Sequence, residues 1–505
     1  MKASELIRLS DSESSVRCEA PGDREFPGVS RDSRTVRPGE IFALLSGRGG
    51  DGMRYLREAE GKGAGAILTD DPALVTSLPR ILTDRVRAAY ARFCAAFAGN
   101  PQRTVRLFAV TGTNGKTSTS FLAESILSAS GRSTALIGTT GARCGGSVFP
   151  FPDEKSGVSQ MTTPDPEILY PLLARLAEAG VTDVVMEASS HSLALDKLDP
   201  LRFRCGIYTN FSPEHLDFHG TMEEYRRAKC KLAPLCGTVL YNGDDPTWRE
   251  TFSGMPGARS FGLGEAYYRA KDPAVRPLGG VHYLLSSPDA VFTVASPLPG
   301  VFTVCNSLAA AALGLTEGIH PLIIAETVRS ISTIPGRMER VPLDRTKSDF
   351  AVYLDFAHTE AALRSLLSSL SPVREAGQRV ITLFGCGGDR DRSKRAPMGR
   401  AACELSDYVY ITEDNSRTED PERIFRDILK GTQGYENYRV IPDRRSAIRQ
   451  AILDARAGDV IILAGKGHET YEIDAAGRRP FSEREIVLSA AKEKYEGKKR
   501  SKNEH

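Results

Sequence analysis

The feature that most constrains the fold is a pattern that recurs from residue 107 onward: a short β-branched run leads through a polar loop into a helical stretch. Strands that alternate with helices form parallel sheets, because each helical crossover returns the chain to the same end of the sheet. The sequence therefore predicts an α/β protein built on parallel sheets. The runs expected to be strands are 107–111, 135–138, 183–186, 206–210, 238–241, 351–354, 379–384, 408–412 and 459–463.

The length of the chain and two proline-containing segments within it predict three domains. A chain of 505 residues is long enough for three domains of about 100–200 residues each. Pro101-Gln-Arg103 marks one boundary and Ile334-Pro-Gly-Arg337 marks another. The predicted segments are a small N-terminal α/β domain over 1–100, a central P-loop-type parallel sheet domain over 101–334, a C-terminal Rossmann-like domain over 335–492 and a flexible tail over 493–505.

Composition excludes several classes of protein. The 66 basic residues balance the 64 acidic ones, so no global charge favours nucleic acid or an anionic membrane. The nine cysteines include no Cys-x-x-Cys pair, and the N-terminus lacks an apolar signal region, which together predict reduced thiols in a cytoplasmic protein. No uninterrupted apolar run is long enough for a membrane span.

Residues 108–118 read Phe-Ala-Val-Thr-Gly-Thr-Asn-Gly-Lys-Thr-Ser. An apolar strand ends there in a glycine loop whose N–H groups can converge on a phosphate, while Lys116 adds positive charge and the Thr117 hydroxyl can ligate Mg²⁺. Val110 stands where the general P-loop pattern has glycine, so a generic NTPase is not the best match. The residues predicted to bind ATP here are Gly112, Thr113, Asn114, Gly115, Lys116, Thr117 and Ser118.

Polar clusters follow most of the other predicted strands. In an open α/β sheet, ligands bind beyond the carboxyl ends of the strands, so these clusters are expected to line clefts. They are Glu187-Ala-Ser-Ser-His191, Asn210, Asp355-Phe-Ala-His358, Gly385-Cys-Gly-Gly-Asp-Arg390, Glu413-Asp-Asn-Ser-Arg417 and Gly465-Lys-Gly-His-Glu469.

These motifs, in this order, resemble the Mur ligases, which form amide bonds in peptidoglycan precursors at the expense of ATP. The other segments that carry the resemblance are Asp32-Ser-Arg34, Pro38-Gly-Glu-Ile-Phe42, Thr162-Thr-Pro164, His215-Leu-Asp-Phe-His-Gly220, Ala228-Lys229 and Gly336-Arg-Met-Glu339. The resemblance implies a cytoplasmic, monomeric ligase that adds a diamino acid to UDP-N-acetylmuramoyl-L-alanyl-D-glutamate through an acyl phosphate, with Mg²⁺ as cofactor.

The resemblance also assigns roles around ATP. Its catalytic set is Lys116, Glu187, Lys229 and His215, and its metal ligands are Thr117, Glu187, His215 and Lys229, the last as a carbamate. Its adenine and ribose contacts are Asn306, Arg337 and Asp355. From the residues alone, Lys229 reads as part of a solvated basic helix face. A capping or packing role fits His219 equally well, so His219 is not included among the metal ligands. Thr303 departs from an asparagine that the family often carries.

For the nucleotide sugar, the resemblance implies contacts from the first two domains. They are Arg31, Ser33, Arg48, Gly49, Gly50, Thr162, Thr163, Ser189 and Lys197. Met161 replaces an asparagine and Lys197 an arginine that relatives often carry, and lysine supplies charge without a bidentate fork.

For the incoming amino acid, the resemblance implies contacts from the last domain: Arg390, Asp414, Asn415, Ser416, Arg417, Gly465 and Glu469. Members that add meso-diaminopimelate carry Asp-Asn-Pro-Arg, whereas this chain has Asp414-Asn-Ser-Arg417. Arg417 favours diaminopimelate, because guanidinium pairs bidentately with a second carboxylate. Ser416 leaves L-ornithine and L-lysine open as alternatives.

Two other classes of function fit the sequence less well. A folylpolyglutamate-type ligase would share the ATP core, but its resemblance would not extend over residues 1–100 or the Asp-Asn-Ser-Arg segment. An inactive binding or scaffold protein would be expected to have lost Lys116, Glu187, Lys229 or Asp355, and all four are present.

Overall fold

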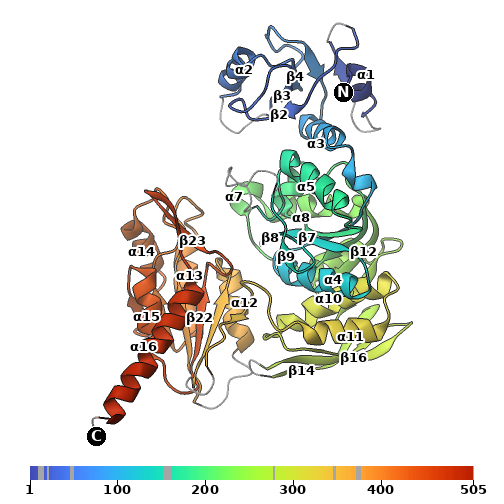
Figure 1. Cartoon of the computed structure of the whole chain (residues 1–505). Helices are drawn as coiled ribbons and strands as arrows, with labels where there is room; N and C mark the ends of the chain where they lie inside the picture. The colour runs from blue at the N-terminus through green and yellow to red at the C-terminus, as the bar shows by residue number, and fades with distance from the viewer. Residues whose placement is uncertain are drawn as a thin grey trace. The chain divides into compact units, whose positions relative to one another are not determined.

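The computed structural model describes residues 1–9, 16–19, 22–45, 51–151, 161–276, 279–344, 349–370 and 377–503. These residues form two compact units, whose helices and strands are labelled in Figure 1. The first unit comprises Met1–Phe211, His219–Ser260 and Ala312–Ile319, and the second comprises Ser212–Phe218, Phe261–Ala311 and His320–His505.

The first unit begins with a small α/β domain. Its five-stranded sheet has the order β1-β5-β4-β3-β2, in which β1 is antiparallel to β5 and the other neighbours are parallel. The strands are β1 (Arg17–Cys18), β2 (Val29–Ser30), β3 (Ile41–Ala43), β4 (Ala66–Thr69) and β5 (Arg80–Leu82), and the helices are α1 (Ala3–Ile7), α2 (Gly52–Gly61) and α3 (Val86–Phe97). The expectation of a small N-terminal α/β fold is confirmed.

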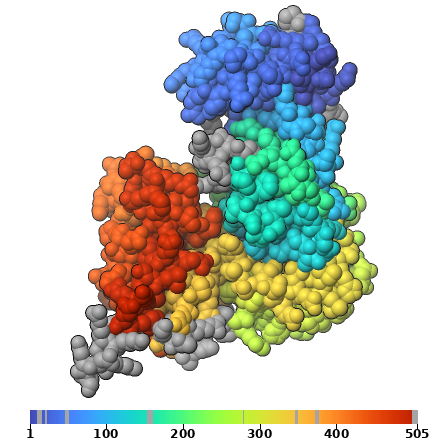
Figure 2. Space-filling model, in the orientation of Figure 1, coloured from blue at the N-terminus to red at the C-terminus, as the bar shows by residue number. Residues whose placement is uncertain are grey.

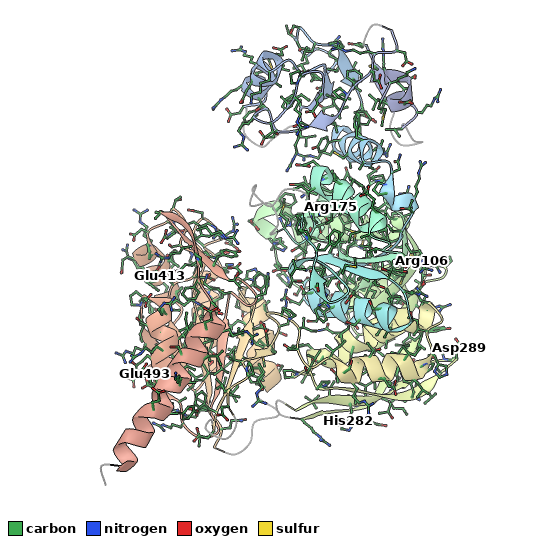
Figure 3. All side chains as sticks on the ribbon, in the orientation of Figure 1. Arg106, Arg175, His282, Asp289, Glu413 and Glu493 are labelled. Carbon is green, nitrogen blue, oxygen red and sulfur yellow. The ribbon has the colours of Figure 1, made fainter. Side chains whose placement is uncertain are left out.

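The rest of the first unit is built on a parallel sheet with strand order β12-β11-β6-β10-β7 and an antiparallel extension by β8 and β9. The strands are β6 (Arg106–Thr111), β7 (Thr134–Gly138), β8 (Gly141–Cys144), β9 (Ser147–Val148), β10 (Asp183–Glu187), β11 (Phe203–Tyr208) and β12 (Cys236–Asn242). β7 and β10 are buried along their whole length, as is typical of parallel strands covered on both faces. At the amino-terminal edge, Arg106, labelled in Figure 3, pairs with Asp183 at 2.5 Å.

Short helices connect these strands, and several begin where the sequence supplies a cap. α5 (Pro166–Glu178) starts with proline after Asp165, and α9 (Pro246–Phe252) starts with proline after Asp245, whose side chain accepts from Thr247 N and Trp248 N. The remaining helices of this unit are η1 (Pro101–Arg103), α4 (Lys116–Ala129), α6 (Ser190–Ala194), α8 (Met222–Cys230) and η4 (Ala233–Leu235), whereas α7 (Leu216–His219) belongs to the second unit except for its last residue.

The second unit contains an antiparallel meander of β14 (Tyr268–Arg276), β15 (Gly280–Ser286) and β16 (Val291–Ser296), which follows β13 (Arg259–Gly262). Two helices follow, α10 (Phe302–Thr316) and α11 (Pro321–Ser330). Tyr283 of β15 and Ser307 of α10 share a buried hydrogen bond of 3.0 Å.

The end of the chain forms a three-layer α/β domain. Its sheet has the order β17-β18-β22-β19-β20-β21, parallel except for β17. The strands are β17 (Glu339–Arg340), β18 (Ala351–Asp355), β19 (Val380–Phe384), β20 (Tyr408–Ile411), β21 (Tyr438–Val440) and β22 (Val460–Ala464), and β23 (Tyr471–Asp474) and β24 (Gly477–Pro480) form a hairpin.

Helices cover both faces of this sheet. Apolar residues of α12 (Glu360–Leu370), α13 (Arg395–Leu405) and α14 (Pro421–Leu429) pack in one core, and those of α15 (Arg444–Asp454) and α16 (Glu483–Asn503) pack in another. α16 lies on the outside of the domain, where Figure 2 shows it in red. The two cores establish the doubly wound, Rossmann-like arrangement that the sequence predicts.

The parallel sheets also carry antiparallel strands, because β1, β8, β9, β14–β16 and β17 pair antiparallel. Two expectations need correction. The strand expected at 206–210 is β11, Phe203–Tyr208. The tail expected from residue 493 is wrong at its start, because α16 continues there: Glu493, labelled in Figure 3, accepts from Arg449 Nε at 2.8 Å. Among the described residues, no helix is long and apolar enough to cross a membrane.

Candidate active site

The loop between β6 and α4 is shaped by two glycines with positive φ. Gly112 has a φ of 142°, and a Cβ there would come within 1.9 Å of Thr209 Oγ1. Gly115, with a φ of 83°, is the N-cap of α4. The Asn210 side chain accepts from Asn114 N at 2.8 Å and donates to Asn114 O at 3.1 Å. The loop therefore presents a fixed backbone at a helix N-terminus, the usual setting for phosphate.

Lys116 is the first residue of α4, and its side chain folds back over this loop. Its Nζ donates to Gly112 O at 3.0 Å and to Thr113 O at 2.8 Å. The ammonium group thus lies at the positive end of the α4 dipole. The charge of Lys116 and the helix dipole both favour an anionic ligand there. The predicted role of Lys116 fits this position.

The Glu187 carboxylate, at the end of β10, is buried with only 1% of the residue exposed. It accepts hydrogen bonds from Thr117 Oγ1 at 3.2 Å, Thr139 N at 2.9 Å and Thr139 Oγ1 at 3.0 Å. Gly138 makes room for it, because a Cβ there would come within 2.2 Å of Glu187 Oε1. A hydroxyl and a carboxylate side by side are hard oxygen donors of the kind that Mg²⁺ takes together with phosphate oxygens and water.

Lys229 does not lie on a solvated helix face, so that reading of the sequence is wrong. It is 1% exposed, its Nζ donates to Gly112 O at 2.7 Å, and the Nζ lies 4.6 Å from the centre of the Tyr225 ring. Tyr225 OH in turn lies 3.2 Å from Thr113 Oγ1. The fold therefore brings Lys116 and Lys229 to the same glycine carbonyl.

The two histidines of the 215–220 motif are placed differently. His219 Nε2 lies 3.0 Å from Ser190 Oγ, and the centres of the His219 and Tyr225 rings are 5.1 Å apart. His215 lies in the second unit, has a φ of 56° and contacts Glu214 at 3.7 Å. Among the described residues, no group of three or more His, Cys, Asp or Glu side chains could hold a metal ion.

Most of the residues predicted for the nucleotide sugar lie within the first unit. Arg31 donates from Nε to Glu167 at 2.6 Å and also pairs with Asp165, and Lys197 Nζ lies 2.5 Å from Asp165. The two predicted cations thus share one acidic residue. Arg48, Gly49 and Gly50 lie outside the described residues.

The hydroxyl residues of this set lie near the Glu187 site, apart from Ser33. Thr162 Oγ1 lies 3.1 Å from Thr139 Oγ1, and Thr163 Oγ1 donates to the Glu187 carbonyl at 2.7 Å. Ser189 donates its N–H to Thr163 Oγ1 at 3.0 Å and caps α6. Ser33 is buried elsewhere, with its hydroxyl 2.8 Å from Glu58.

The residues predicted for adenine and ribose lie in the second unit. Asp355, at the end of β18, accepts from Met338 N and Ala357 N at 2.8 Å each, and burial raises the pKa of its carboxyl group. The Arg337 guanidinium lies 5.1 Å from the centre of the Phe356 ring. Asn306 is buried on α10, with 7% exposed.

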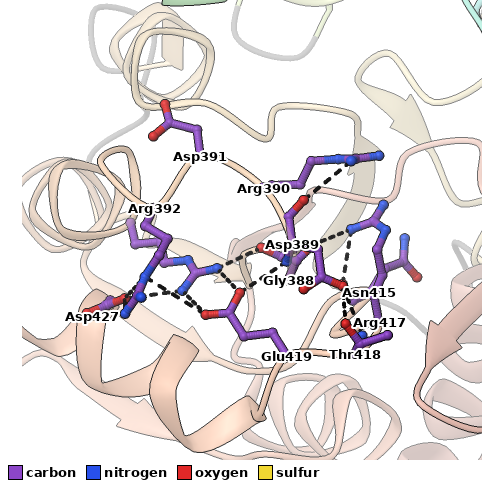
Figure 4. Close-up of polar contacts among 12 residues, drawn as sticks. Gly388, Asp389, Arg390, Asp391, Arg392, Asn415, Arg417, Thr418, Glu419 and Asp427 are labelled. Carbon is purple, nitrogen blue, oxygen red and sulfur yellow. Dashed lines mark hydrogen bonds and ion pairs between the residues drawn. The ribbon is translucent and has the colours of Figure 1, made fainter. Parts of the chain in front are cut away.

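The residues predicted for the amino acid converge after β19, β20 and β22. Asn415 Nδ2 donates to Glu469 at 2.9 Å, and Arg417 Nη1 donates to Gly388 O at 2.8 Å (Figure 4). Ser416 is buried. Gly465 has a φ of 115°, and a Cβ on Gly465 would come within 2.9 Å of Asp414 Oδ2, so the glycine leaves space for the Asp414 carboxylate. Arg390 is exposed and donates to Asp389 O at 3.4 Å.

Lys466, which was not among the residues predicted to bind the amino acid, balances negative charge in this cluster. Lys466 is fully buried and donates to Asn415 Oδ1 at 2.9 Å, and its Nζ lies 3.4 Å from Asp414 Oδ1. Burial alone would raise the pKa of Asp414, but Lys466 and Arg444 hold that pKa below its ordinary value. Burial and the Asp414 charge raise the pKa of Glu469.

Asn210, Thr139, Asp165 and Lys466 are among the residues that contact the site but were not predicted to belong to it. Asn210 and Lys466 stood in strand-end clusters, which was an available signal. Thr139 and Asp165 carried none, because their importance comes from what they contact.

Comparisons with known proteins identify the family of this chain. The family model for the Mur ligase middle domain matches residues 110–314, and the model for the Mur ligase, glutamate ligase domain matches residues 336–467. A protein of Solibacter usitatus (strain Ellin6076) named UDP-N-acetylmuramoyl-L-alanyl-D-glutamate--2,6-diaminopimelate ligase is 39% identical over 480 residues, which are 93% of this chain and 94% of that protein.

A protein of the same name from Syntrophomonas wolfei is 37% identical over 481 residues, covering 93% of this chain and 95% of that protein. A solved structure with that name in its description is 31% identical, with a TM-score of 0.66, and covers 98% of this chain and 99% of that one. The chain therefore belongs to the Mur ligase family.

Proposed function

We propose that this protein is an ATP-dependent ligase that joins 2,6-diaminopimelate to UDP-N-acetylmuramoyl-L-alanyl-D-glutamate. The observation that carries the proposal is the end-to-end similarity to proteins named as ligases of these two substrates. Arg417, the residue expected to bind the second carboxylate of the amino acid, donates a hydrogen bond to the Gly388 carbonyl. Asp165, Arg31 and Lys197 support the nucleotide-sugar part of the proposal. The reaction takes place in the cytoplasm, and the enzyme works as a monomer without nucleic acid.

The chemistry explains why the site needs cations. A carboxylate is a poor electrophile, so its oxygen first attacks the γ-phosphorus of ATP, and the bond from that phosphorus to the bridging oxygen breaks to release ADP. The amine then attacks the carbonyl carbon of the acyl phosphate, loses a proton and expels phosphate. Negative oxygens meet in the first step, and Lys116 at the α4 N-terminus offsets their repulsion.

Thr117 and Glu187 are the residues that would hold Mg²⁺, which supplies positive charge at the β- and γ-phosphates. Their oxygens lie 3.2 Å apart, and Thr139 orients the carboxylate by two hydrogen bonds. Asn306, Arg337 and Asp355 are proposed to contact adenine and ribose, with His215 near a second metal ion.

Lys229 is proposed to act as a carbamate. The unmodified amine is buried against Gly112 O and Tyr225, and carbamylation by CO₂ would convert this buried cation into an anion beside the phosphate loop. Intact mass of the CO₂-equilibrated enzyme should show the added CO₂, and Lys229→Ala should lose it together with activity. Lys231→Ala is the matched control, because Lys231 is half exposed and pairs with Asp196. An active enzyme with unmodified Lys229 would refute this role.

The substrate is tested by comparing acceptors. Initial rates of ADP release are measured with the muramoyl dipeptide and diaminopimelate, L-lysine or L-ornithine, and in parallel with a folate acceptor and glutamate. We expect diaminopimelate to give a kcat/KM at least a hundred times that of lysine, because an arginine left without its carboxylate partner costs about 3–5 kcal/mol when desolvated. A preference for ornithine or lysine would show that Ser416 marks a reshaped pocket and would overturn the proposed amino acid.

A further inference from the structure

Two loops carry most of the residues assigned to the diamino acid, and they are joined closely. The first loop, residues 387–390, follows β19, and the second, residues 414–418, follows β20. A Cβ on Gly388 would come within 1.9 Å of Ser416 O. Gly388 N donates to Asn415 O at 2.9 Å, and Arg417 Nη1 donates to Gly388 O at 2.8 Å (Figure 4). The place of the Arg417 guanidinium therefore depends on the place of the first loop.

Asp389 connects the same two loops through its side chain. Its Oδ2 accepts from Thr418 N at 3.0 Å and from Thr418 Oγ1 at 2.8 Å. Its φ is 53°, a conformation that a residue other than glycine keeps only when its surroundings hold it there. The Asp389 N–H donates to Glu419 Oε2 at 3.0 Å, which supplies part of that restraint.

An ion pair between Arg395 and Glu419 binds the first loop. Neither residue is among those assigned to contact the diamino acid. Arg395 is completely buried and donates to both Glu419 oxygens, from Nη1 at 2.8 Å and from Nη2 at 2.7 Å. Nη2 also donates to Gly387 O at 3.2 Å. The pair is thus hydrogen-bonded to the loop at the Gly387 carbonyl and at the Asp389 N–H. The bidentate geometry fixes the plane of the guanidinium.

We propose that the Arg395–Glu419 ion pair positions the 387–390 loop, so that Gly388 holds the Arg417 guanidinium where the distal carboxylate of the diamino acid arrives. The inference rests on the proposed function and extends it to two residues that do not touch the substrate. A guanidinium displaced by about an ångström loses its alignment with a carboxylate, and such misplacement costs up to about a hundredfold in rate. Burial and the nearby Arg390 lower the pKa of Arg417, so a substrate carboxylate there relieves an unfavourable charge.

The test uses Glu419→Gln and Arg395→Lys in the full chain. For each variant, kcat and KM are measured for diaminopimelate and L-lysine, together with the KM values of ATP and the muramoyl dipeptide and the melting temperature. We expect the KM of diaminopimelate to rise about 10- to 100-fold and the preference for it over lysine to fall by a similar factor. The KM values of ATP and the dipeptide should stay within about twofold.

Two controls separate positioning from general stability. Arg379→Lys disturbs another bidentate pair of this domain, in which Arg379 meets Asp459 at 2.9 and 2.5 Å at the opposite ends of the strands. Lys430→Ala removes an exposed partner of Asp427, to which Arg395 also donates. Both controls should keep the wild-type preference, even where melting changes. A control that lowers the preference as much as Glu419→Gln would overturn the inference.

Asp389→Gly keeps the test decisive if an ion-pair variant does not fold. Its side chain is exposed, and glycine tolerates the positive φ while it removes the acceptor for Thr418. We expect the same loss of preference for diaminopimelate, and an unchanged preference in a folded variant overturns the inference. A wild type that prefers lysine refutes the proposed substrate and this inference together, whereas a wild type that prefers diaminopimelate with unaffected variants refutes this inference alone.

Discussion

A single missing methyl group determines where the Glu187 carboxylate lies. In Gly138→Ala, the new Cβ would meet Glu187 Oε1 at 2.2 Å and Cδ at 2.8 Å, so the carboxylate has to leave its position beside Thr117. We expect amide formation to fall at least about a hundredfold, as for loss of a group that stabilises transferring charge, with about 1–3 kcal/mol of destabilisation from overpacking. Steady-state rates and thermal melting measure both effects.

Gly254→Ala is the matched control, because a Cβ on Gly254 meets nothing within 4 Å. It should keep wild-type rate and melting. If Gly138→Ala also kept the wild-type rate, the placement of Glu187 in the phosphoryl-transfer site would be wrong.

The burial of His358 should make the free energy of unfolding depend on pH. Burial, followed by the charge of Lys394, lowers the pKa of His358 to about 4. The unfolded chain binds a proton below its ordinary pKa of about 6.5, whereas the folded protein does so only near pH 4. The free energy of unfolding should therefore fall by roughly 1–3 kcal/mol as the pH drops from about 6.5 to 4.

Urea unfolding at several pH values in this window measures the effect. His358→Asn should flatten the curve, because asparagine retains a donor for the Phe356 carbonyl, which lies 2.8 Å from His358 Nδ1, but does not titrate. His282→Asn, which changes an exposed histidine on β15, should leave the curve unchanged. An equal pH dependence in wild type and His358→Asn contradicts the assignment.

At the scale of elements, α16 is part of the C-terminal domain beyond residue 492. Lys494 Nζ donates to the Ile452, Leu453 and Ala455 carbonyls at 3.1, 2.7 and 2.6 Å, at the end of α15. A cation there satisfies carbonyls that a helix leaves without partners and lies at the negative end of its dipole.

Truncation after Lys492 should therefore lower the free energy of unfolding by about 2 kcal/mol, since hydrogen bonds to a charged group are worth about 1.5–3 kcal/mol. Truncation after Glu496 keeps Lys494 and the Arg449–Glu493 pair, and should melt close to wild type. Denaturant unfolding of the two truncated proteins is the measurement. Equal stability of both would mean that residues 493–496 add nothing to the domain.

At the scale of the whole molecule, the N-terminal domain is joined to the rest of the first unit by a shared apolar core and by polar contacts. Asp199 pairs with Arg92 of α3 and accepts from Arg85 Nη2 at 3.3 Å, and Tyr90 OH donates to Glu167 at 3.1 Å. The Arg92 and Asp199 side chains are only 10% and 12% exposed. Removal of one partner therefore leaves a largely buried charge.

Asp199→Ala should destabilise the N-terminal domain by about 3–5 kcal/mol, the cost of breaking a buried pair from one side, and should separate its unfolding from that of the remaining domains. Calorimetry would show this as an added transition at lower temperature. Glu19→Ala, which removes the half-buried partner of Arg80, should cost no more than about 1 kcal/mol. A single unshifted transition in Asp199→Ala would contradict this coupling.

Much of the architecture could be predicted from the sequence, because it follows from local patterns. Apolar runs such as 380–384 and 460–464 become strands wherever they are covered on both faces, and the glycines of the 112–117 loop allow only a few backbone paths. The antiparallel strands β8, β9 and β14–β16 were not predicted. β8 and β9 are too short to show a pattern, whereas the apolar residues of β15 and β16 were an available signal. Residue types at strand ends likewise indicated Lys116, Glu187 and Asp414 before any contact was known.

The sequence by itself determined the α/β class, the phosphate loop and the residue types of the site. Only the tertiary structure decided that Lys229 is buried against Gly112 O, that Asp165 holds both Arg31 and Lys197, and that Lys466 balances Asp414. These contacts join residues far apart in the chain. Their partners are therefore set by how the sheets and helices pack, and burial then makes each unpaired charge costly enough to require its partner.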